Sequence, residues 1–92
     1  MTPSAGDTIL VPVKCERGPF SDERLISFDS LDGPISGFIN SDQVEHRGGK
    51  AFIRARVLAV ARDSISLRLH GSFFTTTGLA HIDRDTPFLH AA

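Results

Sequence analysis

The stretch RLISFDSLDGPISGFIN, residues 24–40, decides the fold of this chain. Apolar and polar residues alternate in RLISFDS and again in ISGFIN, as they do in strands that bury one face. The LDGP between them is a turn signal, so the stretch predicts a β-hairpin. Its expected core-facing side chains are Ile26, Phe28, Ile35 and Ile39. Phe38 faces the other way, between Ser36 and Asn40, which places a large aromatic where solvent is expected.

The same alternation predicts three more strands on either side of the hairpin. They span residues 8–16, 51–61 and 65–70. On the last two of these strands the alternation turns Arg54, Arg56 and Arg68 outward, away from the apolar face. The chain therefore has five predicted strands.

The segment SDQVEHRGGK, residues 41–50, interrupts the alternation. Ser41 or Asp42 can cap a helical turn, and Gly48 with Gly49 can end it. We therefore expect a short helical turn after the third strand.

The length of 92 residues and the hydrophobic share of 40% fit one small folded domain. Five short strands with a helical turn after the third favour a small closed or partly closed β-barrel, which removes exposed strand edges. We expect residues 1–5 to be a flexible N-terminus, residues 6–82 to form the barrel, and residues 83–92 to be a loose C-terminal tail. The segment SFFTTTGLAHI, residues 72–82, predicts one more short strand before a turn at Gly78.

Charge is unevenly distributed along the chain, although the net charge is only −1. Residues 1–45 hold three basic and eight acidic side chains, whereas residues 46–70 hold six basic and one acidic. The low net charge argues against nucleic-acid binding by bulk electrostatics. The distribution instead predicts a basic side and an acidic side.

Several classes of protein are not expected from this sequence. No apolar run approaches the roughly 18 residues that cross a bilayer, so no membrane association is expected. Cys15 is the only cysteine, which excludes an internal disulfide. The start MTPSAGD lacks the charge and apolar core of a signal peptide, and we expect a cytoplasmic protein.

Three motifs, in their order, resemble the S-one RNA-binding domain, the oligonucleotide-binding (OB) barrel repeated in the largest protein of the small ribosomal subunit. They are GFIN at 37–40, RVLAV at 56–60 and ISL at 65–67. Asn40 stands where the family usually has histidine. The resemblance covers residues 6–70 and implies an all-β, five-stranded, OB-fold-like barrel. It also implies that single-stranded RNA would bind across the second and third strands.

A surface that binds single strands needs aromatics that stack on bases and cations that contact phosphates. Phe38 and Asn40 share an outward face, Phe20 lies in the preceding loop, and arginine has a planar fork suited to phosphate. The candidate nucleic-acid-binding residues are Phe20, Arg24, Phe38, Asn40, Arg54, Arg56 and Arg68. We therefore expect a non-catalytic module that binds single-stranded RNA weakly.

The other polar residues predict neither catalysis nor a cofactor. The four histidines lack metal-ligand spacing, and no glycine-rich phosphate loop leads from a strand into a helix. The paired aspartates lie in turns with nothing to activate them. Cys15 falls on the apolar face of the first strand, where it is interpreted as a packing residue.

A second function stays open, namely a protein-interaction or regulatory barrel that has lost RNA binding. The near-neutral charge, the missing histidine and the C-terminal segment favour it. In that case Leu25, Phe38, Phe73 and Phe74 would form an apolar patch for a protein partner or for self-association. Alternatively, Phe73 or Phe74 would cover Phe38 within the same chain.

Overall fold

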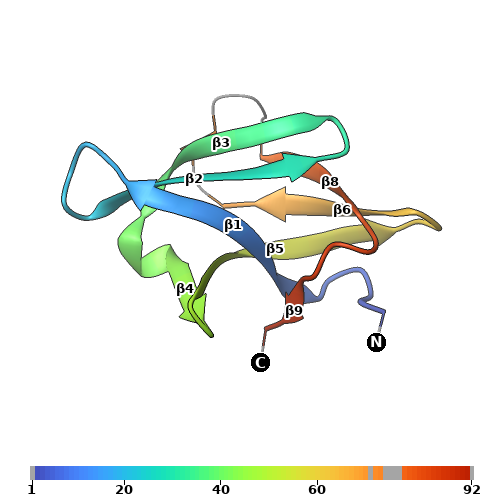
Figure 1. Cartoon of the computed structure of the whole chain (residues 1–92). Helices are drawn as coiled ribbons and strands as arrows, with labels where there is room; N and C mark the ends of the chain where they lie inside the picture. The colour runs from blue at the N-terminus through green and yellow to red at the C-terminus, as the bar shows by residue number, and fades with distance from the viewer. Residues whose placement is uncertain (1, 71, 74–77, 92) are drawn as a thin grey trace.

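The computed structural model describes residues 2–70, 72–73 and 78–91 and shows an all-β chain with a strongly curled sheet (Figure 1). The strands are β1 (Thr8–Arg17), β2 (Glu23–Ser30), β3 (Gly33–Asn40), β4 (Val44–Arg47), β5 (Lys50–Val60), β6 (Ser64–Leu69), β7 (Ser72–Phe73), β8 (Leu79–Asp83) and β9 (Leu89–His90). A 3₁₀ turn, η1 (Ser41–Gln43), follows β3. None of the described residues belongs to a helix that could span a bilayer.

The sheet has the order β7-β3-β2-β1-β5-β6-β8, with β4 added beside β5 and β9 beside β1. β1 links the two halves because its first part, up to Val13, pairs with β5 and its last part, from Lys14, pairs with β2. The curl brings the β2–β3 turn to β8, where the Leu31 backbone N–H donates to the His81 carbonyl at 2.8 Å. His81 Nδ1 also lies 2.8 Å from Asp32 Oδ2. The result is a half-barrel in which the turn of the β2–β3 hairpin contacts β8, the edge strand at the other end of the sheet.

The hairpin of residues 24–40 forms as β2 and β3, with Ile26 paired to Gly37 and Phe28 paired to Ile35. Ile26, Ile35 and Ile39 are buried in the core, as the alternation predicts, and Phe28 packs against it from a half-buried position. The inward residues of β1, of β5 as far as Val57, and of β6 complete this core, together with Ala80 and Ile82 of β8. Ala59 of β5, which the alternation also turns inward, is exposed because the β5–β6 register shifts between Val57 and Ala59.

The segment of residues 41–50 contains a strand that the sequence did not predict. Gly48 and Gly49 both have positive φ, +58° and +79°, and they join β4 to β5 as a two-residue turn closed by the Arg47–Lys50 pair. Two consecutive positive φ values define the hairpin turn that matches strand twist, and glycine adopts them without steric cost. These glycines therefore end β4 rather than a helix. With β4, β8 and β9, the described residues contain nine strands instead of the expected five with one extra before Gly78.

The described part of the expected loose tail, residues 83–91, pairs and packs with the rest of the chain. Asp83 ends β8, and Leu89 and His90 pair with Leu10 and Ile9 of β1. Phe88 packs against the core, and its ring meets that of His90 edge-on, with centroids 5.8 Å apart. This segment is ordered because it adds backbone pairing and apolar burial, which a reading of its polar composition misses.

On β1 and β5, two large side chains at positions that the alternation turns outward are buried. Leu10 is 0% exposed and Phe52 is 4% exposed, yet neither belongs to the main core cluster. Leu89 of β9 lies beside Leu10 in the ladder, and Pro12 lies opposite Phe52. β1 and β5 therefore bury apolar side chains on both faces where they pair.

The N-terminal residues make contacts of their own, although residues 1–5 were expected to be flexible. Pro3 is buried, and Arg84 Nη2 donates to Thr2 Oγ1 at 3.1 Å. The Gly6 backbone N–H donates to the Val57 carbonyl at 2.8 Å. Residues 2–6 therefore contact both β5 and the turn after β8.

Candidate nucleic-acid interface

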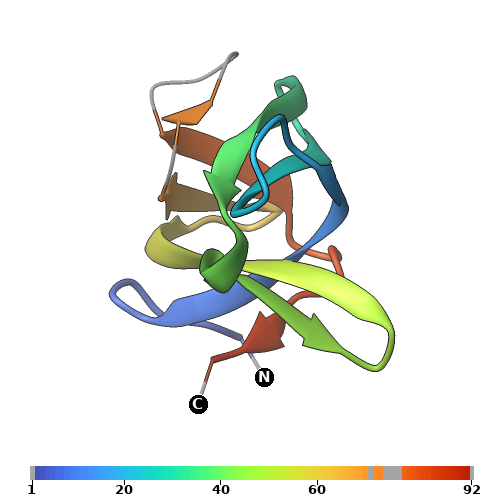
Figure 2. The same ribbon diagram turned by 90° about the vertical axis from the view of Figure 1, so that its left-hand side faces the viewer.

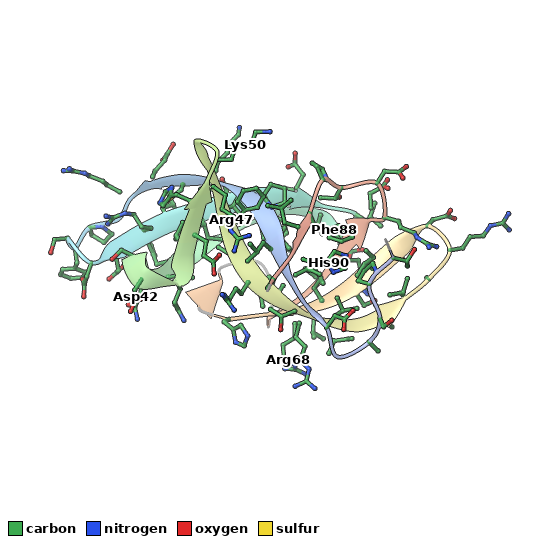
Figure 3. The ribbon with its side chains drawn as sticks, turned by 90° about the horizontal axis from the view of Figure 1, so that it is seen from below. Asp42, Arg47, Lys50, Arg68, Phe88 and His90 are labelled. Atoms are coloured by element: carbon green, nitrogen blue, oxygen red, sulfur yellow. The ribbon has the colours of Figure 1, made fainter. Side chains whose placement is uncertain are left out.

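The outer face of β4, β5 and β6 carries a group of basic side chains. On β5, Ile53, Ala55 and Val57 are buried, so strict alternation turns Arg54 and Arg56 to the opposite face, where both are exposed. We call this group the basic face, and its members are Arg47, Lys50, Arg54, Arg56 and Arg68. Figure 3 shows Arg47 and Lys50 at the β4–β5 hairpin and Arg68 at the opposite edge of the view.

Arg56 and Arg68 are direct partners in the β5–β6 ladder. Like charges opposite one another destabilise an antiparallel pair, because their β-carbons are only about 5 Å apart. Among the described residues neither arginine forms an ion pair with an acid. This pair therefore has unneutralised positive charge that an external anion would stabilise.

Glu45 of β4 partly neutralises the other end of the basic face. Its carboxylate accepts hydrogen bonds from Arg54 Nε at 2.7 Å and from Arg47 Nη2 at 3.2 Å. The hydrogen bond from Arg54 is the main reason that the pKa of Glu45 lies below its ordinary value of 4.5. One carboxylate thus holds two guanidinium groups in place and leaves the face with net positive charge.

The predicted aromatic residues lie elsewhere. Phe20 is 65% exposed in the β1–β2 loop. Phe38 is half-buried on the outer face of β3, opposite Leu25 of β2, and β7 pairs beside it through Ser72. The side chains of Phe73 and Phe74, which were weighed as its cover, lie outside the described residues.

Asn40 and Arg24 occupy two further positions. Asn40 is exposed at the end of β3, and its backbone N–H donates to Gln43 Oε1 at 3.3 Å. Arg24 pairs with Ile39 and with Arg17, so it lies on the inner face of β2, opposite to the face of Phe38. Arg24 Nη1 donates to the carbonyls of Ser21 and Glu23 at 3.0 and 2.8 Å.

The predicted residues therefore divide among three places instead of forming one surface. Arg54, Arg56 and Arg68 share the basic face, Phe38 and Asn40 are on β3, and Phe20 and Arg24 are at the β1–β2 hairpin. In the sheet order, β1 and β2 separate β3 from β5. Sequence reasoning missed Arg47 and Lys50, although their positions on either side of Gly48-Gly49 are the signature of a hairpin that places them opposite each other.

The β1–β2 hairpin and the β4–β5 hairpin both lie on the side of the molecule that faces the viewer in Figure 2. Residues of these two hairpins line a groove. Its volume is about 510 Å³, and its lining includes Arg17, Arg24 and Lys50. We call it the mouth groove. A smaller hollow of about 310 Å³ shares Arg17 and Arg24 with it and is also lined by Phe20.

The described residues contain no group of three or more His, Cys, Asp or Glu side chains placed to hold a metal ion. No protein-family model matches the chain, and comparisons with curated proteins and with solved structures return no match. The resemblance to the S-one domain therefore rests on its three motifs.

Proposed function

We propose that this chain is a non-catalytic module that binds single-stranded RNA weakly through the basic face. The observation that carries the proposal is the Arg56–Arg68 pair, which lies exposed, in direct register and without an acidic partner among the described residues. The preference for single-stranded RNA, and the assignment of the curled sheet to the OB type, come from the resemblance to the S-one domain.

The chemistry of the basic face suits a phosphodiester backbone. Guanidinium groups donate two parallel hydrogen bonds to phosphate oxygens, and their binding releases counterions from the nucleic acid. The exposed Thr8, opposite Arg56 on β1, adds a hydroxyl donor beside the pair. Phosphate contacts position a strand without reading its sequence, so we expect little sequence preference.

Among the residues that the structure describes, the basic face offers no exposed aromatic for stacking, which explains why the proposed binding is weak. Phe52 is the aromatic of β5 on the outer face, and it is buried. A base that stacks on an aromatic contributes about 1–3 kcal/mol, which the basic face does not supply. Affinity then comes from phosphate contacts and should fall steeply with salt.

The experiment is a fluorescence-anisotropy titration of labelled oligo-U at several low salt concentrations. The test protein is Arg56→Gln/Arg68→Gln. The control is Lys14→Gln/Arg62→Gln, which changes the net charge by the same amount at two exposed positions outside the basic face. Loss of two phosphate contacts should reduce the slope of log K against log salt by about 1.4. The control should keep the slope of the unchanged protein.

A third variant tests the position of the surface. Phe38→Ala changes the outer face of β2 and β3, which lies across β1 from the basic face. We expect it to bind oligo-U as the unchanged protein does, with thermal unfolding as a check that it folds. If Phe38→Ala removes binding and the arginine variant does not, the basic face is the wrong surface. No binding at micromolar RNA in low salt would reject the function itself.

A further inference from the structure

The mouth groove contains a second pair of directly opposed arginines. Arg17 ends β1 and pairs with Arg24 of β2, two residues beyond the Cys15–Ile26 pair and therefore on the same face of the sheet. Ile26 is fully buried, so the arginine pair lies on the inner, concave face, just beyond the end of the core. Two cations and a cavity therefore coincide at this place.

Arg24 is anchored by the loop that it borders. Its Nη1 donates to the carbonyls of Ser21 and Glu23, and both bonds use this one nitrogen. Its side chain is half-buried, whereas that of Arg17 is exposed. The anchoring limits the freedom of the Arg24 guanidinium before any ligand arrives, which lowers the entropy lost on binding.

The groove also has apolar walls next to these cations. Val13, Cys15 and Ala51 line it, and all three are half-buried and pack against the core. Lys50 adds a cation from the opposite hairpin, and Glu16 is the acid in the lining. A volume of about 510 Å³ is within the roughly 300–1,000 Å³ typical of small-molecule sites.

We propose that the mouth groove binds a nucleoside monophosphate or a molecule of the same build, with a phosphate group joined to a flat ring system. The phosphate lies between Arg17 and Arg24, and the ring lies over Val13, Cys15 and Ala51. This site uses a different arginine pair from the basic face and does not depend on the proposed RNA binding.

Calorimetric titrations at low salt with adenosine monophosphate, adenosine and inorganic phosphate test the ligand class. We expect adenosine monophosphate to bind several-fold more tightly than inorganic phosphate, and adenosine to bind more weakly than either. Equal affinity for the monophosphate and inorganic phosphate would overturn the ring contact. Absence of binding by both would overturn the site.

The position of the ligand is tested with Cys15, which is the only thiol in the chain. Its rate of reaction with an aromatic disulfide reagent should fall when adenosine monophosphate is present and should not change with inorganic phosphate. An unchanged rate, together with loss of binding in Phe20→Ala, would place the ring in the neighbouring hollow and contradict the proposal.

Arg17→Gln is the first substitution to test, because the structure gives the Arg17 side chain no bond that holds the loop. We expect it to lower affinity for adenosine monophosphate by about tenfold through loss of a charge-assisted hydrogen bond. Arg17→Gln/Arg24→Gln should lower it further, with thermal unfolding as a check on the loop. Arg56→Gln/Arg68→Gln should bind the monophosphate normally even where it loses oligo-U, which separates failure of this site from failure of the proposed function.

Discussion

The two arginine pairs of this protein occupy equivalent positions in their ladders but different kinds of surface. Arg17 and Arg24 lie on the inner face, beside the mouth groove. Arg56 and Arg68 lie on the outer face of β5 and β6, and both are exposed. Two directly opposed arginines therefore lie on a concave surface in one place and on a convex surface in the other.

This comparison shows that register brings like charges together, whereas sheet curvature decides what they can bind. A concave site can enclose a small ligand and remove much of its surface from water. A convex face can only contact a ligand that extends along it, such as a polymer backbone. The two pairs are thus suited to ligands of different size that share a phosphate group.

The largest expected effect concerns the core that holds the curled sheet together. Ile26 is 0% exposed and lies in the core next to the Arg17–Arg24 pair. Ile26→Ala should lower the free energy of unfolding by about 2–5 kcal/mol, because it leaves a cavity that the core can only partly fill. Urea unfolding followed by circular dichroism measures this change. The exposed Leu31→Ala should change stability by less than about 0.5 kcal/mol, and an equal loss in both variants would contradict the assigned core.

A smaller effect is expected at the β4–β5 turn, which carries residues of both surfaces. Gly49 has a φ of +79°, and a β-carbon there would meet no atom within 4 Å. Gly49→Ala should therefore destabilise only through backbone strain, by about 1–2 kcal/mol. Thermal unfolding gives the size of the loss. Gly48→Asn is the matched control, since asparagine tolerates positive φ, and it should cost clearly less.

The Arg56–Arg68 pair should change stability in the direction opposite to most substitutions. Arg56→Gln/Arg68→Gln removes a like-charge contact, so we expect a gain of up to about 1 kcal/mol at low salt. The gain should shrink as salt rises, because exposed charges are screened. Urea unfolding at low and high salt measures it. A loss of stability at low salt would show that the two guanidinium groups do not repel each other.

The smallest expected effect concerns Glu45 and pH. Its pKa in the folded protein is lowered, chiefly by the hydrogen bond from Arg54, so it contributes stability above its ordinary pKa of 4.5. That contribution is lost as the pH falls through the lowered pKa of the folded state. Stability of Glu45→Gln should therefore change less with pH in this acidic range, as measured by unfolding at a series of pH values. If the free energy of unfolding depends on pH identically in both proteins, the stabilising interaction between Glu45 and Arg54 is contradicted.

The same substitution also bears on the basic face at neutral pH. Glu45→Gln releases Arg54 and Arg47 from their shared carboxylate, so affinity for oligo-U should rise and its salt dependence should steepen. Binding of adenosine monophosphate in the mouth groove should not change, because Glu45 does not line it. Anisotropy and calorimetry on the same preparation measure the two effects.

Local alternation predicted the β2–β3 hairpin and the outward arginines of β5 and β6 well. Ile26, Ile35 and Ile39 are buried, and Arg54, Arg56 and Arg68 are exposed. Both results need only the period of two that any strand imposes. Alternation failed for Leu10 and Phe52, because it treats every outward position as solvent and cannot show that β9 adds to the edge of β1.

The candidate site was predictable only in part for the same reason. The sequence alone predicts exposed positions for Phe38, Arg24 and Arg56. The structure places these side chains on different sides of the curled sheet. Which strands neighbour each other, and where β1 changes partner, depends on contacts between residues far apart in the chain. The mouth groove exists only because β1 leaves β5 after Val13 and pairs with β2 from Lys14.

By itself the sequence determined the all-β class, the β2–β3 hairpin, the faces of the central strands and the excess of basic residues over positions 46–70. These depend on side-chain order within a few residues. The tertiary structure decided which arginines are partners, which aromatics are buried and where a concave surface lies. Those features arise from strand register and sheet curvature, because side chains distant in sequence meet only when the sheet closes on itself.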